Sequence, residues 1–291
     1  MEIYRYNYLL DLRTADFLTN MNFKDRFALL HELLRISAQP ITRRWRYIFE
    51  FFDSLKDSEQ EKIFFEITCK EIDHWDEAVL SMHSNSKYVL DQKCEGMFSR
   101  LIKHVSIYKR ESKGNEHLIK IAHNENLENL NMLTIHDSTL NKSGILALKN
   151  SSVLKNIHSL RIQNVVLNPA LRALLYSCSF PNLKHLELIK LGISDSDYSL
   201  LEQASIFEGV QSLNLSSNIL ADGFITTLFD TMTSLPETII LKRNFIKEAG
   251  MNHMLGYLKN TSFQLVDVSK NSIPQDFKSK DTEVLRGTIL Y

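Results

Sequence analysis

Glycine is scarce in this sequence, with 9 residues among 291, or roughly 3% where about 7% is usual. Loops that hold phosphate groups need several glycines close together, so a nucleotide-binding loop is not expected. The three cysteines, Cys69, Cys94 and Cys178, lie far apart and lack the paired spacing of a disulfide framework or a zinc site. The cysteine pattern therefore indicates a cytoplasmic, reducing location, and the sequence predicts neither a metal nor a cofactor.

Long apolar runs and an excess of one charge are also missing. Nowhere do about 18 apolar residues follow one another, as a membrane-spanning helix requires, and the first residues, 1–8, lack the basic-then-apolar progression of a secretory signal. Lys and Arg number 34 against 35 Asp and Glu, a formal net charge of -1. Since no overall basic field exists to attract phosphates, neither nucleic acid nor a membrane surface is expected as a partner.

What the sequence does contain is a repeated frame of eleven positions in its second half. Positions one, four, six and eleven are apolar, and position nine is typically a small polar residue. The clearest copy runs from Val210 to Leu220, with asparagine at position nine. Six copies occur, and their fourth positions are Leu133, Leu160, Leu186, Leu213, Ile239 and Val266. The successive separations are 27, 26, 27, 26 and 27 residues. So regular a period indicates a stack of similar structural units.

This frame resembles the leucine-rich repeat, and its length resembles the ribonuclease-inhibitor-like subtype, in which a strand alternates with a full helix. The resemblance covers residues 130 to 291, more than half of the chain. It implies an α/β solenoid, a horseshoe with a parallel sheet on the concave face and helices on the convex face. The asparagine at position nine is expected to bond the backbone of the turn. Three copies carry Ser138, Val165 and Leu191 there instead, which predicts differently bonded turns.

Residues 1–115 show no such repeat and are rich in aromatic residues. Trp45, Ile48, Phe49 and Phe52 are spaced to share one helical face, and a second helix is expected to begin at Ser58. The segment that includes Leu101 and Val105 has a similar spacing. We therefore expect an N-terminal all-α capping domain over residues 1–115, followed by the repeat domain over residues 116–291.

The predicted binding surface is the concave sheet face. Because side chains alternate along a strand, positions three, five and seven of each frame face away from the core. The candidate partner-binding residues are these positions together with one turn residue: Met132, Thr134, His136, Arg161, Gln163, His185, Glu187, Ile189, Asn214, Ile240, Lys242, Arg243, Leu265 and Asp267. Six strands at about 4.8 Å make a face roughly 24 Å wide, which suits a protein partner better than a small molecule.

These features predict a protein-binding module, monomeric on its own and not an enzyme. Its likeness to ribonuclease inhibitors implies an inhibitor or regulator that covers the active site of a partner enzyme. The short repeat tract with a helical cap also resembles bacterial effectors delivered into the host-cell cytosol. One alternative is an adaptor whose helical half recruits a second protein, such as a ubiquitin-ligase subunit, while the repeats select the target. Another is an enzyme with its site in residues 1–115, where Cys69, His74 and Cys94 would be the reactive groups.

Overall fold

A single sheet of nine parallel strands organises the molecule. The computed structural model describes residues 22–35, 45, 48–49, 51–52, 55, 58–72, 74–75, 81–83, 89, 99–108, 114–274, 277 and 287–291. The strands are β1 (Ser81–His83), β2 (His104–Tyr108), β3 (Met132–His136), β4 (Ser159–Gln163), β5 (His185–Ile189), β6 (Ser212–Asn214), β7 (Thr238–Ile240), β8 (Leu265–Asp267) and β9 (Thr288–Leu290). Each strand pairs with the next one along the chain, so the order in space is the order in sequence.

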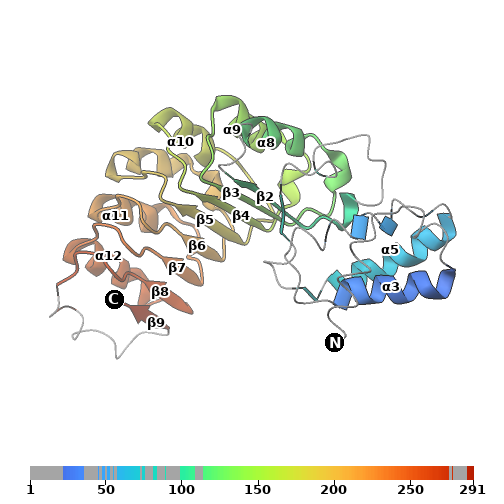
Figure 1. Cartoon of the computed structure of the whole chain (residues 1–291). Helices are drawn as coiled ribbons and strands as arrows, with labels where there is room; N and C mark the ends of the chain where they lie inside the picture. Colours follow the sequence, from blue (N-terminus) through green and yellow to red (C-terminus); the bar gives the residue numbers. More distant parts are fainter. Residues whose placement is uncertain are drawn as a thin grey trace.

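Helices connect the strands and lie together on one side of the sheet (Figure 1). The α-helices of this layer are α8 (Gly114–Ala122), α9 (Lys142–Asn150), α10 (Pro169–Tyr176), α11 (Asp222–Thr231) and α12 (Glu248–Leu258). Short 3-10 helices complete it: η1 (Ser99–Leu101), η2 (Glu125–Leu127), η3 (Leu154–Asn156), η4 (Asp195–Gln203) and η5 (Ser205–Phe207). The stack bends into an arc with the helices outside, and α3 (Phe23–Arg35) and α5 (Ser58–Ile72) lie beyond its β1 end.

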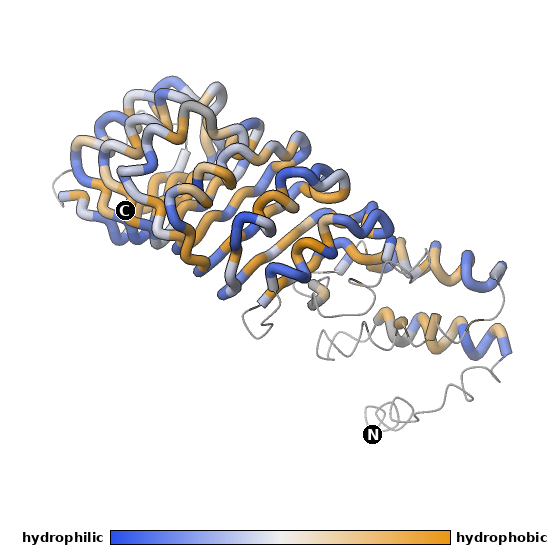
Figure 2. Tube along the Cα trace, turned by 90° about the horizontal axis from the view of Figure 1, so that it is seen from above, coloured by the Kyte–Doolittle hydropathy of each residue, from blue (hydrophilic) through white to orange (hydrophobic). Residues whose placement is uncertain are grey.

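The core lies between the sheet and this helix layer. Leu133, Leu160 and Leu186 are fully buried and stand side by side in the strand register. On the helix side Phe224, Leu228 and other apolar residues close the same core. Figure 2 shows the result as apolar segments running through successive strands and helices, with hydrophilic turns between many of them. The predicted inward direction of positions four and six is therefore confirmed.

The turn after each strand repeats as well. Six residues other than glycine have a positive φ between 51° and 61°, all at position eight of the frame: Asp137, Asn164, Lys190, Ser217, Arg243 and Lys270. The left-handed region is sterically unfavourable for most L-residues. Its recurrence at one position shows that the same sharp turn ends six consecutive strands.

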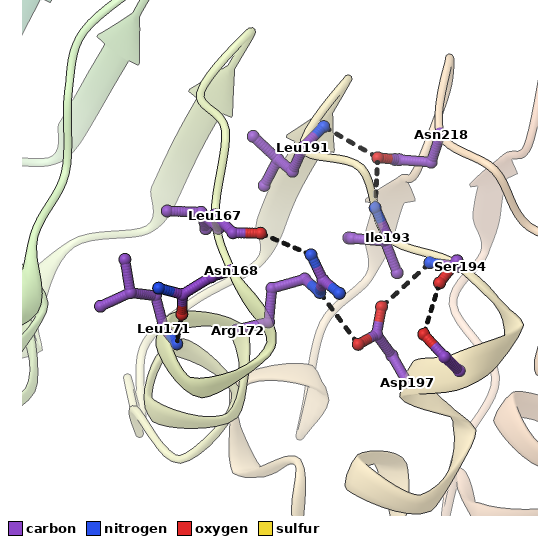
Figure 3. Close-up of polar contacts among 10 residues, drawn as sticks. Leu167, Asn168, Leu171, Arg172, Leu191, Ile193, Ser194, Asp197 and Asn218 are labelled. Carbon is purple, nitrogen blue, oxygen red and sulfur yellow. Dashed lines mark hydrogen bonds and ion pairs between the residues drawn. The ribbon is translucent and has the colours of Figure 1, made fainter.

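Asparagine at position nine bonds the turn as predicted. The Oδ1 atom of Asn218 accepts hydrogen bonds from the backbone N–H groups of Leu191 (2.9 Å) and Ile193 (3.3 Å) in the preceding unit (Figure 3). Its Nδ2 atom donates to the carbonyl groups of Leu188 (2.8 Å) and Leu215 (2.9 Å). Asn244 and Asn271 make the same kinds of bond one and two units later.

The copies without asparagine differ, as expected. Val165 and Leu191 fill position nine with buried apolar side chains. Ser138 is also buried there, and its hydroxyl has no hydrogen-bond partner among the described residues.

The sheet begins earlier than the repeat frame suggested. Strands β1 and β2 lie within residues 1–115, so the expectation that this range is wholly helical is wrong at residues 81–83 and 104–108. Val105, expected in a helix, is in β2, and its register partner Leu133 follows it by 28 residues. The copy is hard to find because position nine is the charged Arg110 and position eleven, apolar in the six other copies, is Ser112. The predicted boundary region, residues 109–113, lies outside the described part of the chain.

The N-terminal region is helical around an aromatic core. Trp45, Ile48, Phe49 and Phe52 are helical and buried, which confirms their predicted shared face. The α5 helix begins at Ser58 as predicted, and its Phe64 packs against Phe23 with the ring centroids 5.5 Å apart. None of the helices within the described ranges is both long and apolar enough to cross a lipid bilayer.

Helix starts are capped from the preceding unit. The Oδ1 atom of Asp195 accepts a hydrogen bond from the N–H of Ala221 (2.6 Å), and its Oδ2 atom accepts one from Gly223 (3.0 Å), at the start of α11. One unit later, Asp222 accepts a hydrogen bond from the N–H of Lys247 (2.8 Å), just before α12. Each carboxylate thus satisfies free N–H groups in the first turn of the next helix.

This close approach explains Gly250 and gives a stability test. A Cβ atom at Gly250 would lie 2.5 Å from Oδ1 and 3.1 Å from Cα of Asp222. We expect Gly250→Ala to lower the free energy of unfolding by about 1–3 kcal/mol, measured by urea denaturation, because the clash also displaces the cap. Gly256→Ala in the same helix is the matched control. Nothing lies within 4 Å of its added Cβ, so it should stabilise α12 by about 0.5–1 kcal/mol. Equal effects of the two substitutions would contradict this account.

Candidate functional site

The side of the sheet away from the helices is open over its central strands. In β4 to β8 the outward side chains are all at least partly exposed to solvent. We call this surface the open sheet face, and its members are Ser159, Arg161, Gln163, His185, Glu187, Ile189, Ser212, Asn214, Thr238, Ile240, Leu265 and Asp267. The strand register aligns them in rows across the sheet, so residues far apart in sequence form one continuous surface.

Most of the predicted binding residues lie on or beside this face. Gln163, His185, Glu187, Ile189, Asn214, Ile240, Leu265 and Asp267 belong to it together with Arg161, and the partly exposed Lys242 follows β7 directly. His136, at the end of β3, is also partly exposed. Arg243 is exposed but belongs to the left-handed turn after β7 rather than to the sheet.

Met132 and Thr134 differ from the rest, because they are 9% and 8% exposed. Their neighbours on β2 that face the same way, His104 and Ser106, are buried too. The Nε2 atom of His104 lies 2.9 Å from the Thr134 hydroxyl and 3.2 Å from that of Ser106. The first strands therefore carry a buried polar network where the sequence predicted open binding positions. The repeat frame could not show this burial, since it predicts the side of the sheet on which a side chain lies and not whether other residues cover that side.

One pair of opposite charges on the open sheet face joins two strands. The Nε atom of Arg161 on β4 lies 3.4 Å from a carboxylate oxygen of Glu187 on β5. Arg161 also donates two hydrogen bonds to the side-chain oxygen of Gln163, at 3.0 and 2.6 Å. Asn214 and Asp267 accept hydrogen bonds from the backbone two residues further on, at Ser216 and Ser269. These contacts hold the polar groups in fixed positions while leaving them partly accessible to a partner.

The helix side carries a very different ion pair. Arg172 of α10 and Asp197 of η4 are 7% and 1% exposed, and Nε of Arg172 lies 2.9 Å from the carboxylate (Figure 3). Arg172 also donates to the carbonyl of Leu167, and Asp197 accepts from the N–H of Ser194. Tyr176 is buried nearby; burial, together with the negative charge of Asp197, raises the pKa of its phenol. The pair joins two successive units of the helix layer and has almost no access to solvent, so we assign it a structural role.

The two described cysteines, Cys69 and Cys178, lie away from the open sheet face. Burial raises the pKa of the Cys178 thiol to about 12, and burial also raises the pKa of the Cys69 thiol in α5. Both thiols are free, and at neutral pH both stay largely in the protonated, weakly nucleophilic form. Cys94 lies outside the described residues. Within the described part of the chain, no group of three or more His, Cys, Asp or Glu side chains is placed to hold a metal ion.

Two features of the turns went unnoticed in the sequence. The first is the left-handed backbone at position eight, which places Lys190, Arg243 and Lys270 at one edge of the sheet. The second is position ten, where Val166, Ile219 and Phe245 are 92%, 52% and 54% exposed. The signal that could have revealed the exposed residues at position ten is an apolar residue between the two buried positions nine and eleven of the turn.

No protein-family model matches the chain, and no curated protein is significantly similar to it.

Proposed function

We propose that this chain is a leucine-rich repeat solenoid that binds a partner protein through its open sheet face. The supporting observation is a helix-free surface of five aligned strands, β4 to β8, with partly exposed polar, charged and apolar side chains. At about 4.8 Å per strand it is roughly 19 Å across, which suits an interface of about 800 Å² per partner. The further proposal is inhibition: a rigid arc loses little conformational entropy on binding, so it can block a partner enzyme tightly. The free cysteines support a role in a reducing compartment.

A charge reversal on this face tests the proposal. The partner is first captured from the native source with the full chain and identified by mass spectrometry, and its binding is then measured with both proteins purified. We expect Arg161→Glu combined with Lys242→Glu to weaken binding by about tenfold to a hundredfold, because the introduced carboxylates oppose the partner's complementary charge. The free energy of unfolding should change by no more than about 1 kcal/mol, since both side chains are partly exposed.

The matched control reverses two exposed charges on the helix side, Lys142→Glu and Lys155→Glu, and should leave binding unchanged. If the double variant on the open sheet face bound the partner as tightly as the control, the proposal would be wrong. Inhibition is measured separately, as loss of the partner's activity on addition of the chain.

An adaptor is the second candidate, favoured by apolar exposure on the helical region. Phe23 and Phe27 of α3 and Ile63 of α5 are 42%, 38% and 40% exposed. Neighbouring exposed apolar side chains of this size are typical of a docking surface. An adaptor would capture two proteins. Phe23→Ser combined with Ile63→Ser would release one of them, and Arg161→Glu combined with Lys242→Glu would release the other.

A further inference from the structure

A row of exposed apolar side chains follows the turns at one edge of the sheet. Ile219 and Phe245 occupy position ten of successive units and are 52% and 54% exposed, while the residues on either side of each are buried. Val166, two units before Ile219, is 92% exposed. Side chains alternate between core and solvent along the extended turn, so the apolar residue at position ten of each of these three units points to solvent. We call these three residues, with Gly192 in the unit between Val166 and Ile219, the apolar row.

The turns that carry Ile219 and Phe245 stack directly on those of the units before them. The N–H of Ile219 donates to the carbonyl of Ile193, and the N–H of Phe245 donates to that of Leu220, both at 2.8 Å. Gly192 has no side chain, and no atom lies within 4 Å of the position that a Cβ would take. At about 4.8 Å per unit the row is roughly 14 Å long, and it is interrupted at Gly192. About four residues of extended chain span that length.

Basic side chains stand beside the apolar row. Lys190, Arg243 and Lys270 are exposed and occupy the left-handed position eight, with φ of 54°, 57° and 61°. We call these three residues the basic edge. Within the described residues, none of the three has an ion-pair partner.

Three carboxylates in the turns and helix starts around the basic edge accept hydrogen bonds from other groups. Asp195 and Asp222 accept hydrogen bonds from helix-starting N–H groups, and Asp137 bonds Asn164. Glu248 is exposed in the first turn of α12. As far as the structure describes the chain, the basic edge thus presents to a partner three positive charges that make no ion pair.

From this arrangement we propose that the edge binds an extended acidic segment of the partner protein, whose apolar side chains contact the apolar row. The proposal rests on the proposed function and names the chemistry of the partner. A protein segment fits better than RNA, because Phe245 is the one member of the apolar row with a ring for base stacking, while Val166 and Ile219 are aliphatic. A planar anionic membrane would also lie against the carboxylates of Glu187 and Asp267 on the adjoining open sheet face, whereas a short acidic segment would contact the edge alone.

The left-handed backbone allows a test in which stability and binding change in opposite directions. Glycine adopts a positive φ without steric cost, so Arg243→Gly and Lys270→Gly should raise the thermal midpoint while removing two charges. The probe is a fluorescein-labelled ten-residue peptide of Glu and Asp with Leu and Phe at its centre, measured by fluorescence anisotropy on the full chain. We expect the double variant to bind it about tenfold more weakly at low salt. Phe245→Ser should also weaken binding. Lys142→Gly with Lys155→Gly is the matched control for charge and should leave binding unchanged.

Control ligands give outcomes that would overturn the inference. A peptide with Lys for every acid, and one with Ser for Leu and Phe, should bind far more weakly than the probe. The proposal is wrong if the double glycine variant binds the probe as tightly as the unaltered chain. It is also wrong if phosphatidylserine vesicles or a poly-uridine oligonucleotide compete for the edge more strongly than the peptide.

The captured partner separates this inference from the proposed function. The open-face variant is Arg161→Glu with Lys242→Glu, and the edge variants are Arg243→Gly with Lys270→Gly, and Phe245→Ser. If the open-face variant released the partner and the edge variants did not, the acidic segment would be rejected and the open-face proposal would stand. If only the edge variants released the partner, the open-face proposal would be rejected and binding at the edge would stand.

Discussion

Arg172→Met should lower the free energy of unfolding by about 3–5 kcal/mol, the largest effect we expect from one substitution. Methionine fills much of the space but removes the charge that faces Asp197, whose side chain is 1% exposed. The carboxylate would then be buried with the N–H of Ser194 as its remaining described partner. An isolated buried charge is far more costly than a buried pair. Urea denaturation followed by circular dichroism measures the loss.

Two further variants separate this effect from a loss of packing. Arg172→Met combined with Asp197→Leu removes both charges and should recover most of the lost stability, because no unpaired charge remains. Arg161→Met breaks the pair with Glu187, whose side chains are 38% and 30% exposed, and should cost less than about 1 kcal/mol. If the double variant were no more stable than Arg172→Met, the buried charge would not be the cause.

Asn218→Ala is expected to cost about 3 kcal/mol. The substitution deprives two backbone N–H groups, of Leu191 and Ile193, and two carbonyl groups, of Leu188 and Leu215, of a buried partner. Each buried polar group left unsatisfied costs about 1–3 kcal/mol, and relaxation of the turn offsets part of that. The measurement is again the free energy of unfolding in urea.

Asn260→Ala is the matched control for this substitution. Asn260 is exposed and makes a single long contact, 3.4 Å, to the carbonyl of Gly256, so its loss should change stability by less than about 0.5 kcal/mol. An effect of Asn218→Ala as small as that would show that water replaces the asparagine in the turn.

The repeat frame predicted the central sheet because its signal is periodic and local. Leu160, Leu186 and Leu213 lie in register at the spacing read from the sequence, and the asparagine of each clear copy bonds its turn. The ends of the sheet were not predicted. Ile289 in β9 follows its partner Val266 by 23 residues, a shorter interval than any between the six copies.

The candidate site was predictable only in part. Alternation places Glu187 and Asn214 on the outward side correctly, since it depends on strand geometry alone. It cannot show that Met132 and Thr134 are buried, because that depends on contacts beyond their own unit. The ion pair of Arg172 and Asp197 was also missed, because the two residues lie 25 positions apart on helices whose mutual placement the frame does not specify.

The polar links between units run in opposite directions along the chain. Asp195 and Asp222 each cap the helix of the following unit, whereas Asn218 and Asn244 each satisfy the backbone of the preceding one. The unit that contains Asn218 and Asp222 therefore cannot melt without exposing unsatisfied groups in both of its neighbours. A bound partner that grips only two or three units should accordingly slow local opening along the rest of the arc, so that protection from hydrogen exchange extends well beyond its footprint.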